Sequence, residues 1–74
     1  MTLEKLQRVM WRLRKTNPGI KKPSYVELEK AIMHECGTHK VTYYSTRRAL
    51  TTLGWIKSIT PKRFEITDKD LSDT

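Results

Sequence analysis

The chain has 74 residues, a single cysteine and a net charge of +7. This length limits it to one small domain without room for a large catalytic cavity, and the lone cysteine excludes an internal disulfide framework. No apolar run exceeds four residues, so we expect neither a membrane span nor a signal peptide, and we expect a cytoplasmic protein.

The positive charge is concentrated in the body of the chain. Residues 1–67 hold 14 Lys and Arg against 5 Glu, a charge of +9, whereas three of the last seven residues are Asp. A surface with this balance favours polyanions such as nucleic acid as partners. We therefore expect a functional domain over residues 1–67 and an acidic, flexible tail over residues 68–74.

Residues 2–16 show helical periodicity, with an apolar stripe that includes Leu3. Trp11 lies off this stripe and needs cover from the rest of the fold or from a second chain. The candidate surface for a homodimer is therefore Leu6, Met10, Trp11 and Leu13, although so small a domain also needs apolar residues for its own core. Asn17-Pro18-Gly19 ends this helix, and residues 20–23 are predicted to be extended and able to pair as an edge strand.

A second helix is predicted to begin at Ser24, because Ser24 and Glu27 have the spacing of a capping box. It turns Leu28, Ala31 and Ile32 inward and ends at Gly37. A third helix over residues 40–53 follows after a cap at Thr38. Two helices joined by so few residues form a helix–turn–helix unit.

The third helix has two different sides. One side is predicted to be buried and carries Tyr43, Thr46, Leu50 and Leu53. The opposite side carries Tyr44, Ser45, Arg48 and Thr52, and no acidic residue occurs between positions 36 and 64. Helices exposed only for solubility usually mix both signs of charge, so this side is predicted to face a partner.

A β-hairpin is predicted to follow Gly54, with strands over residues 55–59 and 64–67 and a cationic turn over residues 60–63. Phe64 and Ile66 alternate with polar residues, as in a half-buried strand. The expected fold class is α+β, in the order helix, short strand, helix, helix, strand, strand.

The third helix ends in the run Leu50-Thr51-Thr52-Leu53-Gly54-Trp55-Ile56. This run, placed after a capped helix pair and before a basic hairpin, resembles the winged helix–turn–helix family of DNA-binding domains. The resemblance covers about residues 3–67, and the size is similar to that of small regulators from archaeal viruses and plasmids. One departure is Thr46, where such helices often carry Val or Ile.

The resemblance implies sequence-specific binding of double-stranded DNA, most simply by a transcriptional regulator. Its third helix would enter the major groove through Thr42, Tyr44, Ser45, Arg47 and Arg48. The hairpin tip, or wing, would reach phosphates or the minor groove through Lys62 and Arg63. Flanking phosphates would be held by Lys40 and by Lys21 or Lys22.

Two other classes of function stay open at this stage: a winged-helix module that binds an acidic protein, and a binder of RNA or single strands. A metal site is not expected, because His34, Glu35, Cys36 and His39 lack the spacing of a closed zinc site. Cys36 and His39 also have no third group to orient them as a catalytic pair. We therefore expect no enzyme activity and no cofactor.

Overall fold

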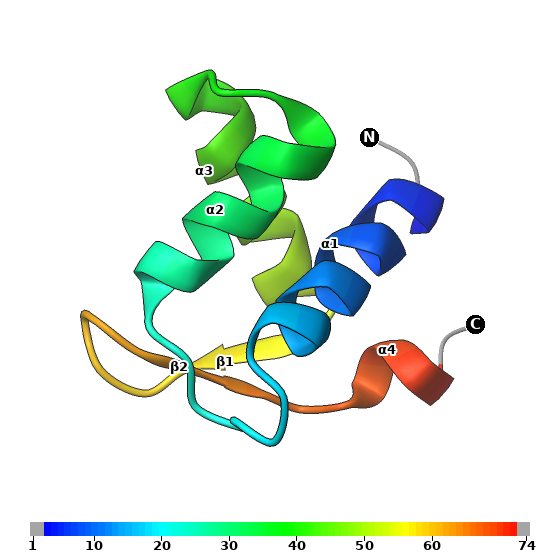
Figure 1. Ribbon diagram of the computed structural model, residues 1–74, viewed down its shortest axis with the longest axis vertical. Coiled ribbons are helices and arrows are strands. Elements are labelled where there is room, and N and C mark those ends of the chain that lie inside the picture. The colour runs from blue at the N-terminus through cyan, green and yellow to red at the C-terminus, as the bar shows by residue number, and fades with distance from the viewer. Residues whose placement is uncertain (1–2, 73–74) are drawn as a thin grey trace.

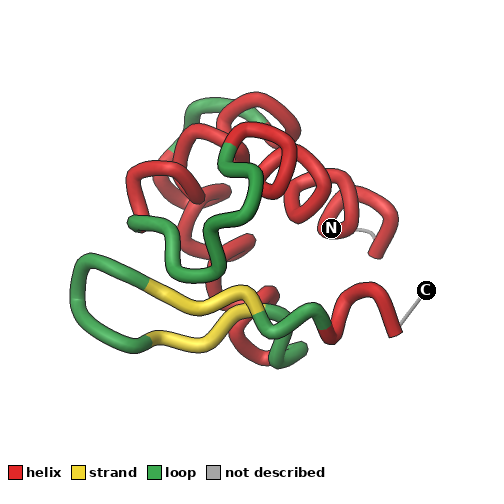
Figure 2. Tube along the Cα trace, turned by 60° about the horizontal axis from the view of Figure 1, so that its bottom comes forward, coloured by secondary structure: helices red, strands yellow, loops and turns green. Residues whose placement is uncertain are grey.

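The computed structural model describes residues 3–72, which form four helices and one two-stranded antiparallel hairpin (Figure 1). The elements are α1 Leu3–Thr16, α2 Tyr25–Cys36, α3 Lys40–Thr52, β1 Ile56–Ser58, β2 Phe64–Ile66 and α4 Lys69–Ser72. The expected α+β class is confirmed. The helices α1 to α3 pack together, and the hairpin runs along one side of this helical part (Figure 2).

Helix α1 buries Leu6, Val9, Met10 and Leu13 against the rest of the molecule, as its periodicity predicts, whereas Leu3 of the same stripe is exposed. The helix ends because Asn17 folds back: its side-chain amide donates to the Leu13 carbonyl over 3.1 Å. Gly19 then adopts a φ of 78°, a conformation that glycine reaches without steric cost. The chain is thereby turned towards the hairpin.

Helix α2 packs against both α1 and α3, and residues 37–39 connect it to α3. Gly37 ends α2 with a φ of 103°, and its N–H bonds the Met33 carbonyl. The start of α2 differs from the expectation, because the Ser24 side chain makes no capping bond. Ser24 instead pairs with Arg63 in an isolated antiparallel bridge. The cap of α3 is His39, one residue later than expected.

The hairpin pairs Ile56 with Ile66 and Ser58 with Phe64, and it places Trp55, Ile56, Phe64 and Ile66 in the core. Its first strand is shorter than predicted, because the chain already bends at Ile59 into the turn. There the Ile59 and Thr60 N–H groups both donate to the Arg63 carbonyl over 3.2 Å. The Thr60 hydroxyl accepts from the Arg63 N–H over 3.0 Å, which fixes the turn locally.

Residues 20–23 pair with β2 but do not form a strand of their own. The Lys21 carbonyl accepts from Ile66 N–H over 2.9 Å, and the Pro23 carbonyl accepts from Phe64 N–H over 3.2 Å. Pro23 has no N–H to return, so the ladder stays incomplete. The expected edge pairing is present with fewer bonds than a regular strand would make.

The segment after residue 67 differs from the flexible tail that its composition suggested. Residues 69–72 form α4, which lies at the end of the hairpin away from the turn (Figure 1). Arg14 of α1 donates to both oxygens of Asp70 over 2.6 Å, and Asp70 is 4 % exposed. Sequence periodicity carries no sign of this long-range pairing. Residue 73 and residue 74 lie outside the described residues.

Candidate nucleic-acid interface

The outward side of α3 is mostly polar and exposed, and the opposite side lies in the core. Thr46 and Leu50 are fully buried, and the Thr46 hydroxyl is satisfied by the Thr42 carbonyl at 2.7 Å. Burial of these two residues leaves one set of side chains exposed along α3, namely Lys40, Val41, Tyr44, Ser45, Arg48, Thr51 and Thr52. We call this set the outward face of α3. Thr42 is half-buried at its flank.

Arg47 and Arg48 have different surroundings. Arg48 is exposed on the outward face, whereas Arg47 is half-buried, with its guanidinium carbon 3.8 Å from the centre of the Tyr25 ring. Burial raises the pKa of the neighbouring Tyr43 phenol, and the positive charge and hydrogen bond of Arg47 oppose that shift. Arg47 therefore takes part in the packing of α3 on α2, and Arg48 is left to a partner.

Tyr25 connects the Arg47 flank of α3 to the turn of the hairpin. Arg47 covers its ring, the Phe64 ring centre lies 5.0 Å from its own, and its N–H donates to the Lys62 carbonyl over 3.0 Å. The start of α2, the middle of α3 and the base of the turn are thus joined at one residue. The two cationic elements cannot move apart without breaking these contacts.

Three exposed cations lie in or beside the turn. Lys62 and Arg63 belong to the turn, and Lys22 belongs to the segment that precedes α2. The Arg63 guanidinium donates to the Lys22 carbonyl over 3.0 Å, which holds the segment before α2 beside the turn. Within residues 3–72, no ion pair involves any of these three cations or Lys40 or Arg48. Their charge is therefore available to an anionic partner.

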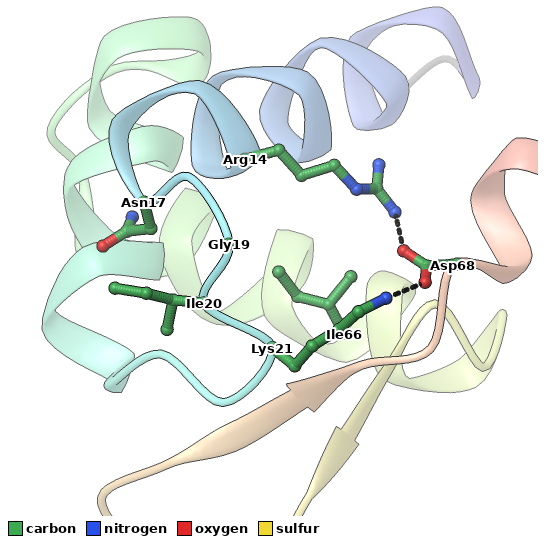
Figure 3. A pocket seen from close by; sticks show the side chains of 7 residues that line it. All are labelled: Arg14, Asn17, Gly19, Ile20, Lys21, Ile66 and Asp68. Atoms are coloured by element: carbon green, nitrogen blue, oxygen red, sulfur yellow. Dashed lines mark hydrogen bonds and ion pairs between the residues drawn. The ribbon is translucent and has the colours of Figure 1, made fainter.

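Lys21 does not join these three cations. It pairs with Asp68, and Arg14 donates to the same carboxylate over 2.9 Å (Figure 3). These residues line a small pocket of about 230 Å³ at the α4 end of the hairpin. Lys22, the other residue of the pair that the sequence left open, is exposed and makes no ion pair within residues 3–72, and its backbone carbonyl lies beside the turn.

Three acidic residues of α1 and α2 are paired on other surfaces, whereas Glu29 of α2 is exposed and makes no ion pair within residues 3–72. Glu35 accepts from Arg12 over 2.9 Å, Glu4 lies 3.3 Å from Arg8, and Glu27 lies 3.8 Å from Lys30. The outward face of α3 contains no acidic side chain. This face therefore carries cations, hydroxyls, a phenol and the apolar Val41, and a nearby acid is Glu29, whose negative charge helps to raise the pKa of Tyr43.

The candidate dimer surface on α1 requires a correction. Leu6, Met10 and Leu13 are buried in the core of the monomer, so they cannot also present a contact surface. Their stripe packs in the core with residues of α2, because so small a domain needs these side chains for its own core. Of the four candidate residues only Trp11 is exposed, at 56 %. The Lys15 ammonium lies 4.7 Å from the centre of one of the Trp11 rings.

Two features of the outward face escaped the sequence reasoning. Val41 is 77 % exposed, the highest value for a large apolar side chain in residues 3–72. Thr51 and Thr52 line a shallow depression of about 380 Å³ with Tyr44, Arg47 and Arg48. Thr52 was predicted to face outward, and helical spacing also indicates Val41 and Thr51, since positions 41, 44, 48, 51 and 52 share one side of the helix.

No three His, Cys, Asp or Glu side chains in the described part of the chain are placed to share a metal ion. Every helix among residues 3–72 is too short or too polar to cross a lipid bilayer. A comparison of the chain with models of protein families, with curated proteins and with solved structures gives no match. The function is therefore argued from the geometry of this surface.

Proposed function

We propose that the protein is a winged helix–turn–helix domain that binds double-stranded DNA in a sequence-specific manner, as a transcriptional regulator. One observation carries the proposal. Helix α3 is buried on one side, and on the other it offers hydroxyls and cations that make no ion pair within residues 3–72, with a cationic hairpin turn linked to it through Tyr25. An α-helix with such a side fits the major groove of B-DNA, which is about 12 Å wide.

In this proposal Arg48 reads bases, because a free guanidinium can donate two hydrogen bonds to one guanine. Ser45, Tyr44 and Thr52 supply hydroxyls on either side of it. Phosphates are contacted by the cations at the edges of the surface, Lys22, Lys40, Lys62 and Arg63, which fix the register of the protein on the duplex. Arg47 contributes positive charge while it holds α3 against Tyr25.

The dependence of binding on salt tests the proposal. The cations at this surface suit about four to six phosphate contacts, so log affinity should fall against log salt with a slope of about −3.6 to −5.4. The measurement is fluorescence anisotropy on a duplex selected from a random pool, with single-stranded DNA as competitor. A flat salt response, or equal binding of the single strand, contradicts the proposal.

Two alanine variants separate base reading from phosphate contact on the same duplex. Arg48→Ala should lower affinity for the selected sequence by about 1–3 kcal/mol and leave random DNA nearly unchanged. Lys62→Ala should lower the affinity for the selected and the random duplex alike, and it should reduce the magnitude of the salt slope by about 1. Identical behaviour of the two variants would show that the division into readers and anchors is wrong.

A further inference from the structure

We infer that Val41 reads the 5-methyl group of a thymine, at a position close to the guanine read by Arg48. This inference rests on the proposed function and adds a specificity element to it. Val41 is the second residue of α3 and the most exposed large apolar side chain in residues 3–72. It lies on the outward face with Tyr44, Ser45 and Arg48, at intervals of three, four and seven residues.

The stability of the domain gives no reason for a valine at position 41. A β-branched side chain loses rotamer freedom in a helix, and valine is a poorer helix former than alanine, lysine or glutamate. Because Val41 is 77 % exposed, burial in the monomer does little to offset this cost. An apolar residue at the start of a helix that faces DNA is explained by contact with a partner.

The chemistry of the major groove selects that partner. Thymine is the only one of the four DNA bases that presents a methyl group in this groove, and apolar side chains contact it there. Val41 offers two methyl groups and neither donates nor accepts a hydrogen bond. The Tyr44 ring, which lies 5.1 Å from the Tyr43 ring in an edge-on arrangement, flanks this position one turn further along α3.

Helical geometry places the thymine relative to the guanine. Seven residues separate Val41 from Arg48, which corresponds to about 10.5 Å along the helix axis. Successive base pairs are about 3.4 Å apart, so the two contacts lie within about three base pairs of each other. The selected sequence should therefore contain a thymine and a guanine at this spacing.

The test removes the methyl group from the DNA and the side chain from the protein. Each thymine of the selected duplex is replaced in turn by deoxyuridine, which keeps the base pairing but lacks the 5-methyl group. Anisotropy titrations then compare the natural chain with Val41→Ala. Val26→Ala is the matched control, because Val26 is 58 % exposed near the start of another helix, α2.

One deoxyuridine position should weaken binding by the natural chain about fourfold, the factor expected for one methyl-sized apolar contact. Val41→Ala should bind the thymine and deoxyuridine duplexes equally, whereas Val26→Ala should keep the difference. The inference is overturned if no position is sensitive to the methyl group, or if Val41→Ala retains the sensitivity. If either result is found while the natural chain still binds the selected duplex specifically and in a salt-dependent manner, the proposed function stands. If the natural chain binds no duplex DNA, the inference and the proposed function are both overturned.

Discussion

Arg47 and Arg48 show how neighbouring residues in one helix can serve different purposes. A helix rotates by about 100° per residue, so Arg47 reaches the flank that touches α2 and Arg48 reaches the outward face. The guanidinium carbon of Arg47 lies 3.8 Å from the centre of the Tyr25 ring, and this cation–π contact joins α3 to α2. The exposed Arg48 makes no ion pair within residues 3–72.

Alanine at each position should therefore affect stability differently. We expect Arg47→Ala to lower the free energy of unfolding by about 0.5–2 kcal/mol, because it removes the contact with Tyr25. Arg48→Ala should change it by less than about 0.5 kcal/mol, as for other surface substitutions. Urea unfolding followed by the fluorescence of the buried Trp55 measures both values. Equal losses in the two variants would contradict these roles.

Several contacts at the residue scale could not be predicted from the sequence. The periodicity of α3 identified its buried side and Arg48 as exposed, because both follow from helical spacing alone. The periodicity could not show that Arg47 and Arg48 have different roles. Tyr25, the partner of Arg47, lies 22 residues away in the chain, and only the packing of α2 on α3 brings the two residues together. Ser24 fits a capping box, yet its pairing with Arg63 replaces the expected side-chain bond.

At the scale of elements, α4 is attached to α1 by charge. Arg14 contacts the carboxylates of Asp68 and Asp70, and Lys21 also pairs with Asp68 (Figure 3). The Lys21 hydrogen bond, and after it the Arg14 hydrogen bond, lower the pKa of Asp68 below its usual value of 3.8. The hydrogen bonds to Asp70 in turn raise the pKa of Arg14. These acids were expected in a free tail because sequence periodicity cannot show a pairing over more than 50 residues.

The lowered pKa of Asp68 predicts a stability effect that depends on pH. Because the folded state favours the carboxylate, this contribution is complete above pH 3.8 and is lost as pH falls through the lower pKa of the folded state. Asp68→Asn should therefore be less stable than the natural chain at pH 7, and the two should converge in stronger acid. Asparagine also tolerates the positive φ of 60° at this position, so the comparison isolates the charge.

Urea unfolding at several pH values checks this prediction, with Glu4→Gln as the control. The Glu4–Arg8 pair is exposed, with side-chain exposures of 76 % and 66 %, so its loss should have little effect at any pH. An Asp68→Asn variant as stable as the natural chain at pH 7 would contradict the prediction. A difference that persists undiminished in strong acid would also contradict it.

At the scale of the whole molecule, Asp68 and Asp70 are separated from the proposed DNA surface. Four cations that make no ion pair within residues 3–72 lie on the outward face of α3 or at the hairpin turn, namely Lys40, Arg48, Lys62 and Arg63, whereas Asp68 directly precedes α4 and Asp70 lies within it. Lys57 of β1 and Lys69 of α4 also make no ion pair there, but they lie outside the proposed surface. Arg14 and Lys21 hold the two acids there, away from the proposed DNA surface. Such an asymmetric charge distribution orients a protein as it approaches a polyanion.

The most direct measurement is an NMR titration of the ¹⁵N-labelled protein with the selected duplex, which reports the environment of each backbone amide. If α3 and the hairpin turn bind DNA, we expect the largest chemical-shift changes at residues 40–52 and 60–63, with small changes on the exposed side of α1 and in α4. Changes centred on Trp11 or on α4, with α3 and the turn undisturbed, would contradict it.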